Sequence, residues 1–238
     1  MVIKIYDPRY LDDRITKESL SPPSHPWNFA NEQAAVMARP QNSELSDEQL
    51  INKIYFVGPE DLSGEDLAIL WEERYYRLLM NSYAVELSAY ERLKDLQGSA
   101  IPRLIMAGEF LPPDKRAIQP PALVLEYIPS VSLHDVSLTA ITPALCKQLV
   151  STIESFPSHG VIHNDITFTN IHFTPPERPE KVFVIDFGCS IIRSEEYDEE
   201  HWTELGVFDV RRGRRLLEDK DLRKSDAPAS RFRLDFSV

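Results

Sequence analysis

Residues 161–190 read VIHNDITFTNIHFTPPERPEKVFVIDFGCS, and this stretch decides how the rest of the chain is interpreted. Asp165 comes shortly after an apolar pair, and Asn170 follows it by five residues. Asp186 comes at the end of a second apolar run, residues 182–185. An apolar strand that delivers an acidic residue at its end suits a metal ligand, and Mg²⁺ binds oxygen atoms. The stretch therefore predicts a site in which Asn170 and Asp186 share a magnesium ion.

The order and spacing of these residues, H-x-D-x-x-x-x-N followed by D-F-G, is the pattern of a phosphoryl-transfer site. Such a transfer requires one carboxylate near the attacking hydroxyl and side-chain oxygens on Mg²⁺. Asp165 fits the first role, and His163 would support its loop from behind. The plainer alternative is a polar loop with an N-capping aspartate, followed by an ordinary turn. Six fixed letters at ~1/20 each match by chance in far fewer than about one in a thousand chains, which favours the functional interpretation.

Composition sets the outer limits of function. The chain has 238 residues, 42% of them hydrophobic, which is enough for a core in one large domain or two small lobes. Its net charge of -12 argues against nucleic acid as the main partner. Cys146 and Cys189 are too few for a disulfide framework or a structural zinc site. The first ten residues lack the apolar run of a signal peptide, and no stretch is apolar enough to span a membrane, so the cytoplasm or nucleus is expected.

Local patterns predict the elements around this stretch. An S-x-x-Q capping box at residues 46–49 opens a short helix, and three- and four-residue apolar steps predict a long helix over 63–97 that stops at Gly98. Residues 11–65 are otherwise expected to form an irregular insertion, apart from a short helix at 29–38. Further helices are expected at 143–158 and at 202–224, the second one basic. The predicted strands are 2–6, 102–110, 122–128, 161–162, 171–173 and 182–185.

Two charged positions stand out among the apolar patterns. Lys4 is central in the alternating run VIKIY, where a buried lysine is costly unless it is paired, although it could equally lie on an exposed edge strand. Two glutamates of the long helix could be its partner. Glu86 shares a face with the apolar Tyr90 and Leu93, whereas Glu91 lies about 100° further round the helix and is expected in solvent. This favours Glu86, against the alternative that both glutamates are solvated.

At these residues the chain resembles the protein-kinase-like superfamily, in the atypical branch that includes aminoglycoside phosphotransferases and fungal kinase-like proteins. The resemblance spans residues 2–190. It implies an α+β fold of two lobes: a small β-rich N-lobe over 1–126 with the insertion at about 11–65, and a helical, shortened C-lobe over 127–238. The segments that carry it are VIKIYDPRY, ELSAYERLKDLQGSAIPRL, ALVLEYIP, VIHNDITFTN and VFVIDFGCS.

The resemblance also implies a set of roles and ligands. ATP and Mg²⁺ would be the cofactors, and the acceptor would be a hydroxyl of a protein or a small molecule. Lys4 would contact the α- and β-phosphates and pair with Glu86. Backbone groups between Glu126 and Ile128 would hold the adenine at a hinge. Asp165 would accept or orient the proton of the substrate hydroxyl.

The chain departs from the family pattern in ways that leave three functions open. Lys4 is so near the first residue that the family's glycine-rich loop has no place before it, which implies a truncated N-lobe or ATP bound without its usual cover. Asn164 stands where the family has an arginine, so activation by loop phosphorylation is not expected. Thr167 stands where Ser/Thr kinases carry a lysine. The chain is therefore interpreted as an active phosphotransferase, with a non-catalytic pseudokinase-type binding module or a truncated gene product as the alternatives.

Overall fold

The computed structural model describes residues 1–11, 14, 25–56 and 63–222. The chain forms two compact units: residues 1–2, 84–106 and 124–238 make up the first, and residues 3–83 and 107–123 the second. Residues 84–106 group with the C-terminal part of the chain. The predicted lobes of 1–126 and 127–238 divide the chain at a different place and stay a prediction. Parts of the predicted insertion (12–13, 15–24 and 57–62) and the basic residues Arg223 and Lys224 lie outside the described residues.

The predicted insertion is largely helical where the structure describes it. Helix α1 covers Phe29–Asn42 and helix α2 covers Asp47–Phe56. The capping box of α2 is confirmed, because the Gln49 amide N–H donates to the Ser46 hydroxyl at 3.1 Å and the Gln49 side chain accepts from the Ser46 N–H at 2.8 Å. The prediction of irregular structure after residue 38 was wrong. Helix α1 continues through Pro40, and only then does the Ser43 N–H close the last turn on the Arg39 carbonyl.

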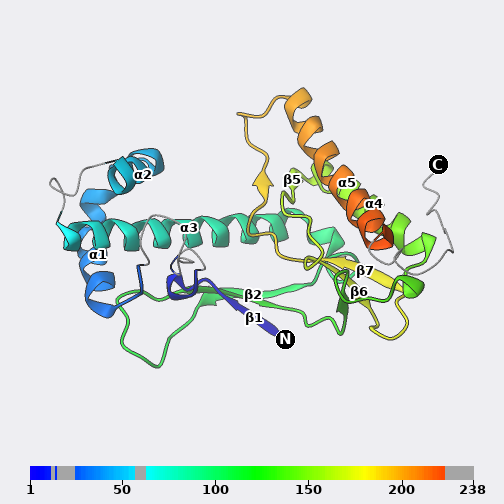
Figure 1. The fold of residues 1–238 in the computed structure, drawn as a ribbon, viewed down its shortest axis with the longest axis horizontal. Coiled ribbons are helices and arrows are strands. Elements are labelled where there is room, and N and C mark those ends of the chain that lie inside the picture. Colours follow the sequence, from blue (N-terminus) through cyan, green and yellow to red (C-terminus); the bar gives the residue numbers. More distant parts are fainter. Residues whose placement is uncertain (12–13, 15–24, 57–62, 223–238) are drawn as a thin grey trace. The chain divides into compact units, whose positions relative to one another are not determined.

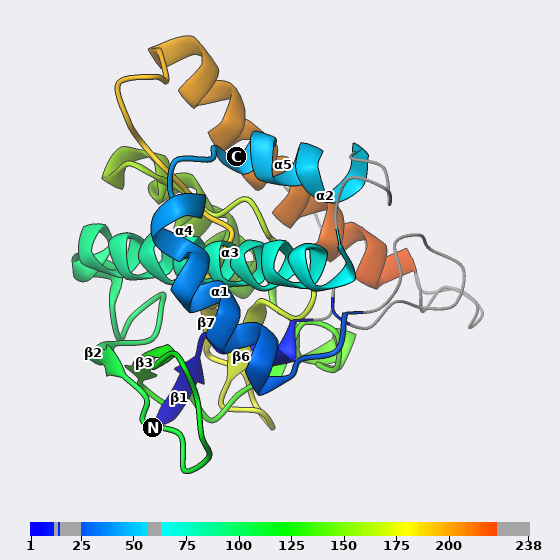
Figure 2. The same ribbon diagram turned by 90° about the vertical axis from the view of Figure 1, so that its left-hand side faces the viewer.

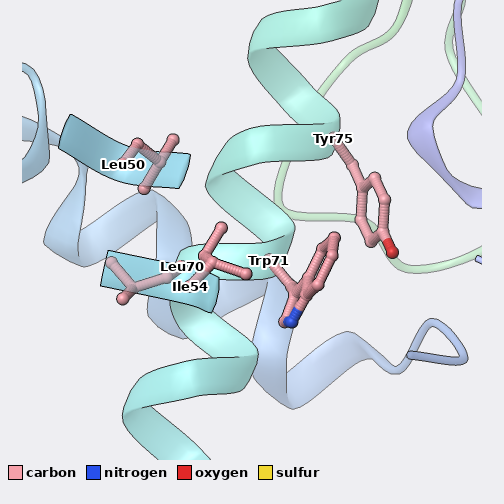
Figure 3. Packing of buried hydrophobic residues seen from close by; sticks show 5 residues of the cluster. All are labelled: Leu50, Ile54, Leu70, Trp71 and Tyr75. Atoms are coloured by element: carbon pink, nitrogen blue, oxygen red, sulfur yellow. The ribbon is translucent and has the colours of Figure 1, made fainter. Parts of the chain in front are cut away.

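The first half of helix α3, Gly64–Arg92, organises the second unit. Helices α1 and α2 lie beside this part of α3 (Figure 2). The apolar steps that predicted the long helix bury Leu70, Trp71 and Tyr75, which pack with Leu50 and Ile54 of α2 (Figure 3). Burying apolar side chains of this size stabilises a fold by about 1.5–3 kcal/mol each. The insertion is therefore held by a core of its own.

Buried ion pairs fasten the loops of this unit. Arg116 lies 2.7 Å from Asp7 and 2.7 Å from Glu32, and all three side chains are buried. Arg14 pairs with Glu72 at 2.6 Å, also in a buried position. These pairs connect residues far apart in sequence, such as Asp7 and Arg116, so no local sequence pattern predicts them.

A small sheet of three strands follows the order β1–β3–β2. The strands are β1 Val2–Ile5, β2 Leu104–Glu109 and β3 Pro121–Leu125, which confirms three predicted strands in slightly shorter form. The pairing of β1 with β3 continues one residue beyond β1, because the Tyr6 N–H donates to the Pro121 carbonyl at 2.9 Å. Strand β3 is mostly buried and β2 mostly exposed.

The other unit combines two helices with two small antiparallel sheets. Helices α4, Pro143–Ser155, and α5, Glu199–Leu222, lie side by side (Figure 1), and α4 also contacts strand β7. Strand β6, Ile171–Thr174, pairs with β7, Lys181–Val184, and on its other edge with the short β4, Val131–Ser132. Strand β5, Val161–Ile162, pairs with β8, Ile191–Ile192.

The architecture is thus α+β, as predicted. The remaining short elements are 3-10 turns at Pro8–Tyr10, Lys94–Leu96, Leu138–Ala140 and Pro157–His159. Helix α3 ends at Arg92, five residues before the predicted Gln97, and a 3-10 turn leads from it towards Gly98, whose φ of 75° is a conformation that glycine adopts readily. Within the described part of the chain, no helix has both the length and the apolar character needed to cross a bilayer.

Candidate active site

The β6–β7 hairpin brings the two predicted motifs together. In its register Ile171 pairs with Val184, and the Ile185 N–H donates to the Asn170 carbonyl at 2.9 Å. Asn170 therefore lies opposite the residue that precedes Asp186. The predicted metal ligands, sixteen positions apart in sequence, become neighbours because antiparallel pairing folds the chain back on itself.

Asn170 also fixes Asp165. Its side-chain amide donates to a carboxylate oxygen of Asp165 and to the Asp165 carbonyl, both at 2.9 Å. Since the amide nitrogen is engaged twice, the side-chain oxygen of Asn170 is the atom left for another partner. One hairpin thus brings the backbone of Asn170 next to Asp186, and one amide joins Asn170 to Asp165.

This set of donors fits a magnesium ion. Among the described residues no group of three His, Cys, Asp or Glu side chains gathers as a metal cage. Mg²⁺ is ordinarily held by one or two carboxylates together with water and phosphate oxygens, so a full protein cage is not required. The side-chain oxygens of Asp186 and Asn170 are the ligands this unit would supply. That role for them stays a prediction.

His163 supports the loop from behind, as its place in the motif predicts. The ring is fully buried, its Nδ1 accepts from the Asp165 N–H at 3.2 Å, and its Nε2 donates to the Ile185 carbonyl at 3.0 Å. One neutral tautomer, protonated on Nε2, satisfies both contacts. Burial lowers the pKa of His163, which keeps the ring neutral. His163 therefore positions Asp165 relative to the strand that carries Asp186.

Asp209 of helix α5 is a positioning residue that the sequence interpretation missed. One of its carboxylate oxygens accepts from the N–H of His163 at 2.8 Å and from the N–H of Asn164 at 3.1 Å. The carboxylate is buried, and that burial raises its pKa, although the two backbone bonds act in the opposite direction. The sequence did hold a signal: Asp209 falls at helical spacing from the buried Trp202 and Leu216, so it lies on the face that packs inward.

Two residues of the site have a left-handed backbone. Asn164 has φ of 61° and Asp186 has φ of 67°, and no other described non-glycine residue has a positive φ. Asn and Asp adopt this region more readily than other non-glycine residues, but the conformation still costs free energy. Residues with such backbone strain cluster at functional sites. The Asn164 side chain donates to the Cys189 carbonyl at 3.1 Å, which ties the Asp165 loop to the D-F-G segment.

Phe187, the residue directly after Asp186, packs inward. It is fully buried, edge to face with Tyr90 and with Phe156, each at a ring separation of 5.6 Å. Tyr90 comes from α3, one turn after Glu86. Glu86 is fully buried while Glu91 is exposed, as their faces on the helix predict. The pairing of Glu86 with a lysine stays a prediction.

The other predicted site residues make contacts within their own units. Lys4 belongs to β1 and to the other unit, where its ammonium group lies 5.3 Å from the centre of the Tyr6 ring. The Glu126 N–H donates to the Arg103 carbonyl at 2.9 Å, and the Glu126 carboxylate pairs with the Arg103 side chain at 2.8 Å. The Ile128 carbonyl accepts from the Ser130 hydroxyl at 3.0 Å. Phosphate binding by Lys4 and adenine binding at 126–128 stay predictions.

Comparison with known proteins gives structural likeness alone. No family model matches the sequence, and no curated protein matches it. Among solved structures, the Rio2 kinase–ADP/Mg²⁺–phosphoaspartate complex from Chaetomium thermophilum is similar with a TM-score of 0.43 and 19% identity, covering 65% of this chain and 43% of that one. WaaP in complex with acyl carrier protein is similar with a TM-score of 0.36 and 20% identity, covering 59% of this chain and 66% of that one.

This chain therefore spans less than two thirds of either structure. Because both TM-scores are below 0.5, the assignment of a function rests on the geometry of the site.

Proposed function

We propose that this chain is a kinase-like phosphotransferase that uses ATP and Mg²⁺ to phosphorylate a hydroxyl group. One observation carries the proposal. The hairpin places Asn170 beside Asp186, while the Asn170 amide binds the Asp165 carboxylate at 2.9 Å. A phosphoryl-transfer site needs a carboxylate for the acceptor hydroxyl next to oxygen ligands for the metal, and this arrangement supplies both.

Each side chain then has a defined task. The Asp165 carboxylate accepts or orients the proton of the acceptor hydroxyl, and His163 and Asp209 hold its loop in place. Asn170 and Asp186 hold Mg²⁺, which when bound neutralises charge on the β- and γ-phosphates. Lys4 contacts the phosphates and pairs with Glu86. The backbone between Glu126 and Ile128 binds the adenine.

Removing the metal ligand tests the first half of this proposal. Wild-type protein should melt at a higher temperature in Mg-ATP, because a ligand at 100-fold its Kd stabilises by about 2.7 kcal/mol. Asp186→Asn should lose the magnesium-dependent part of that shift. Glu177→Gln is the matched control, because it removes an exposed carboxylate from the same hairpin. A wild-type protein that gains no stability at millimolar Mg-ATP contradicts the proposal.

Removing the proton acceptor tests the second half. Asp165→Asn should bind Mg-ATP as the wild type does and lose phosphate transfer or ATP hydrolysis by about 10²–10⁴-fold. Turnover that survives this change would show that Asp165 is misassigned. Wild-type binding with no turnover toward protein or small-molecule hydroxyls would favour the non-catalytic binding module.

A further inference from the structure

The Tyr90 hydroxyl is a buried polar atom that the proposed roles do not use. Tyr90 is 0% exposed, and within the described part of the chain its hydroxyl has no hydrogen-bond partner. Leaving such a group unsatisfied costs about 1–3 kcal/mol. A phenylalanine would fill the same space without that cost, so packing alone does not explain a tyrosine at this position. The hydroxyl therefore points to a partner that arrives with a ligand.

Its surroundings indicate where that partner belongs. Tyr90 follows Glu86 by one turn of α3, and its ring packs edge to face on Phe187, the residue directly after Asp186. Burial raises the pKa of Tyr90, and the negative charges of Glu86 and Asp186 raise it further. The phenol thus stays protonated, so its hydroxyl is available as a hydrogen-bond donor.

We propose that the Tyr90 hydroxyl positions the divalent cation of this site, by donating a hydrogen bond to a carboxylate oxygen or a water that binds the cation held at Asp186. The inference rests on the proposed function, because it presumes that Asp186 is a metal ligand. Groups that hydrogen-bond to metal ligands orient them, and their loss commonly weakens metal binding by 10- to 100-fold. Tyr90 is accordingly a positioning residue and does not touch the reacting atoms.

The test replaces one oxygen atom and measures metal binding directly. Mn²⁺ is titrated into wild type, Tyr90→Phe and Asp186→Asn in the presence of ADP, and free Mn²⁺ is followed by electron paramagnetic resonance. Tyr90→Phe should bind Mn²⁺ about tenfold more weakly than wild type. Its melting temperature without metal should be equal or higher, because an unsatisfied hydroxyl has been removed. Tyr76→Phe is the matched control, since Tyr76 is on the same helix and keeps its ring contact with Arg39.

The possible outcomes separate this inference from the proposed function. Wild-type Mn²⁺ binding that is lost in Asp186→Asn but unchanged in Tyr90→Phe overturns the inference and leaves the proposed function in place. A Tyr90→Phe protein that melts lower without metal and keeps its Mn²⁺ affinity also overturns it, because the hydroxyl is then only structural. Wild-type protein with no binding that depends on Asp186 overturns the proposed function, and the inference with it.

Discussion

Two groups of acidic side chains differ in what satisfies them. In the unit of residues 3–83 and 107–123, Asp7 and Glu32 each lie 2.7 Å from the guanidinium of Arg116. In the other unit, Asp209 accepts backbone N–H groups and Asp165 accepts the Asn170 amide. Within the described residues neither of these two aspartates forms an ion pair. The first group is neutralised by guanidinium groups of the protein, whereas the second is held by uncharged donors.

We expect this difference to separate the carboxylates that hold the fold from those of the proposed site. A buried ion pair holds two segments together but gives the acid no capacity to bind anything else. An acid held by neutral donors is fixed in place without a countercharge from the protein, which a metal site or a proton acceptor requires. Mutations that affect the two groups differently test this contrast.

The largest effect is expected from breaking the ion-pair group. Arg116→Met removes the cation that Glu32 and Asp7 share and leaves Asp7 with Arg9 alone, so it should lower the free energy of unfolding by about 3–5 kcal/mol, measured by urea titration. Arg215→Met is the control, since Arg215 is exposed and its neighbour Asp219 is 3.9 Å away. A loss below about 1 kcal/mol for Arg116→Met would show that this group resembles surface pairs.

Asp209 should also respond to acid in the opposite direction from Asp7 and Glu32. Burial works to raise the pKa values of Asp7 and Glu32, but their hydrogen bonds and the nearby positive charge, with Arg116 the main contributor, together outweigh it and leave both pKa values below the usual 3.8 and 4.5. Their stabilisation is therefore present above the unfolded pKa and is lost as the pH falls through the folded one. Asp209 has a raised pKa, mainly through burial, so its ionisation costs stability as the pH rises.

A middle-sized effect is expected at Asp209. Asp209→Ala leaves the N–H groups of His163 and Asn164 without their acceptor and should cost about 1–3 kcal/mol. Asp209→Asn keeps an acceptor oxygen without the charge, so between pH 3 and 7 its stability should rise more steeply with pH than that of wild type. Unfolding measured across this range compares the two. Equal slopes would contradict the raised pKa.

The smallest effect concerns the left-handed backbone at Asn164. Asn164→Gly and Asn164→Ala both lose the bond to the Cys189 carbonyl, so their difference isolates the conformation with φ of 61°. Glycine should be more stable by about 1 kcal/mol, because alanine meets the steric penalty of that region. Thermal unfolding of the pair measures it. Equal stability would mean that the backbone relaxes when the side chain is removed.

Local sequence patterns predicted the parts of the structure that local chemistry determines. The capping box at Ser46 and the helical steps around Leu70 were confirmed because each depends on residues a few positions apart. The hairpin that joins Asn170 to Ile185 follows from two short strands with one connection. The facing of Glu86 and Glu91 followed from helix periodicity alone.

Long-range pairings were beyond this kind of inference. Asp7 and Arg116 are 109 positions apart, and Asp209 is 46 from His163, so each choice of partner depends on the finished packing. The passage of α1 through Pro40 was missed because a proline inside a helix is normally read as its end. The sequence pattern predicts Tyr90 only as a core residue. Helical periodicity indicates that a side chain is buried, but it does not indicate what its hydroxyl contacts.

The hydrogen bonds from two backbone amides to Asp209 couple the motion of the Asp165 loop to helix α5. Hydrogen exchange at the amides of His163 and Asn164 requires their bonds to the Asp209 carboxylate to open. Those bonds persist as long as α5 keeps its place against α4, so the loop and the helix should form one cooperative unit of local unfolding. A molecule that binds the outer surface of α5 and stabilises this helix would therefore slow the opening of the Asp165 loop without contacting it.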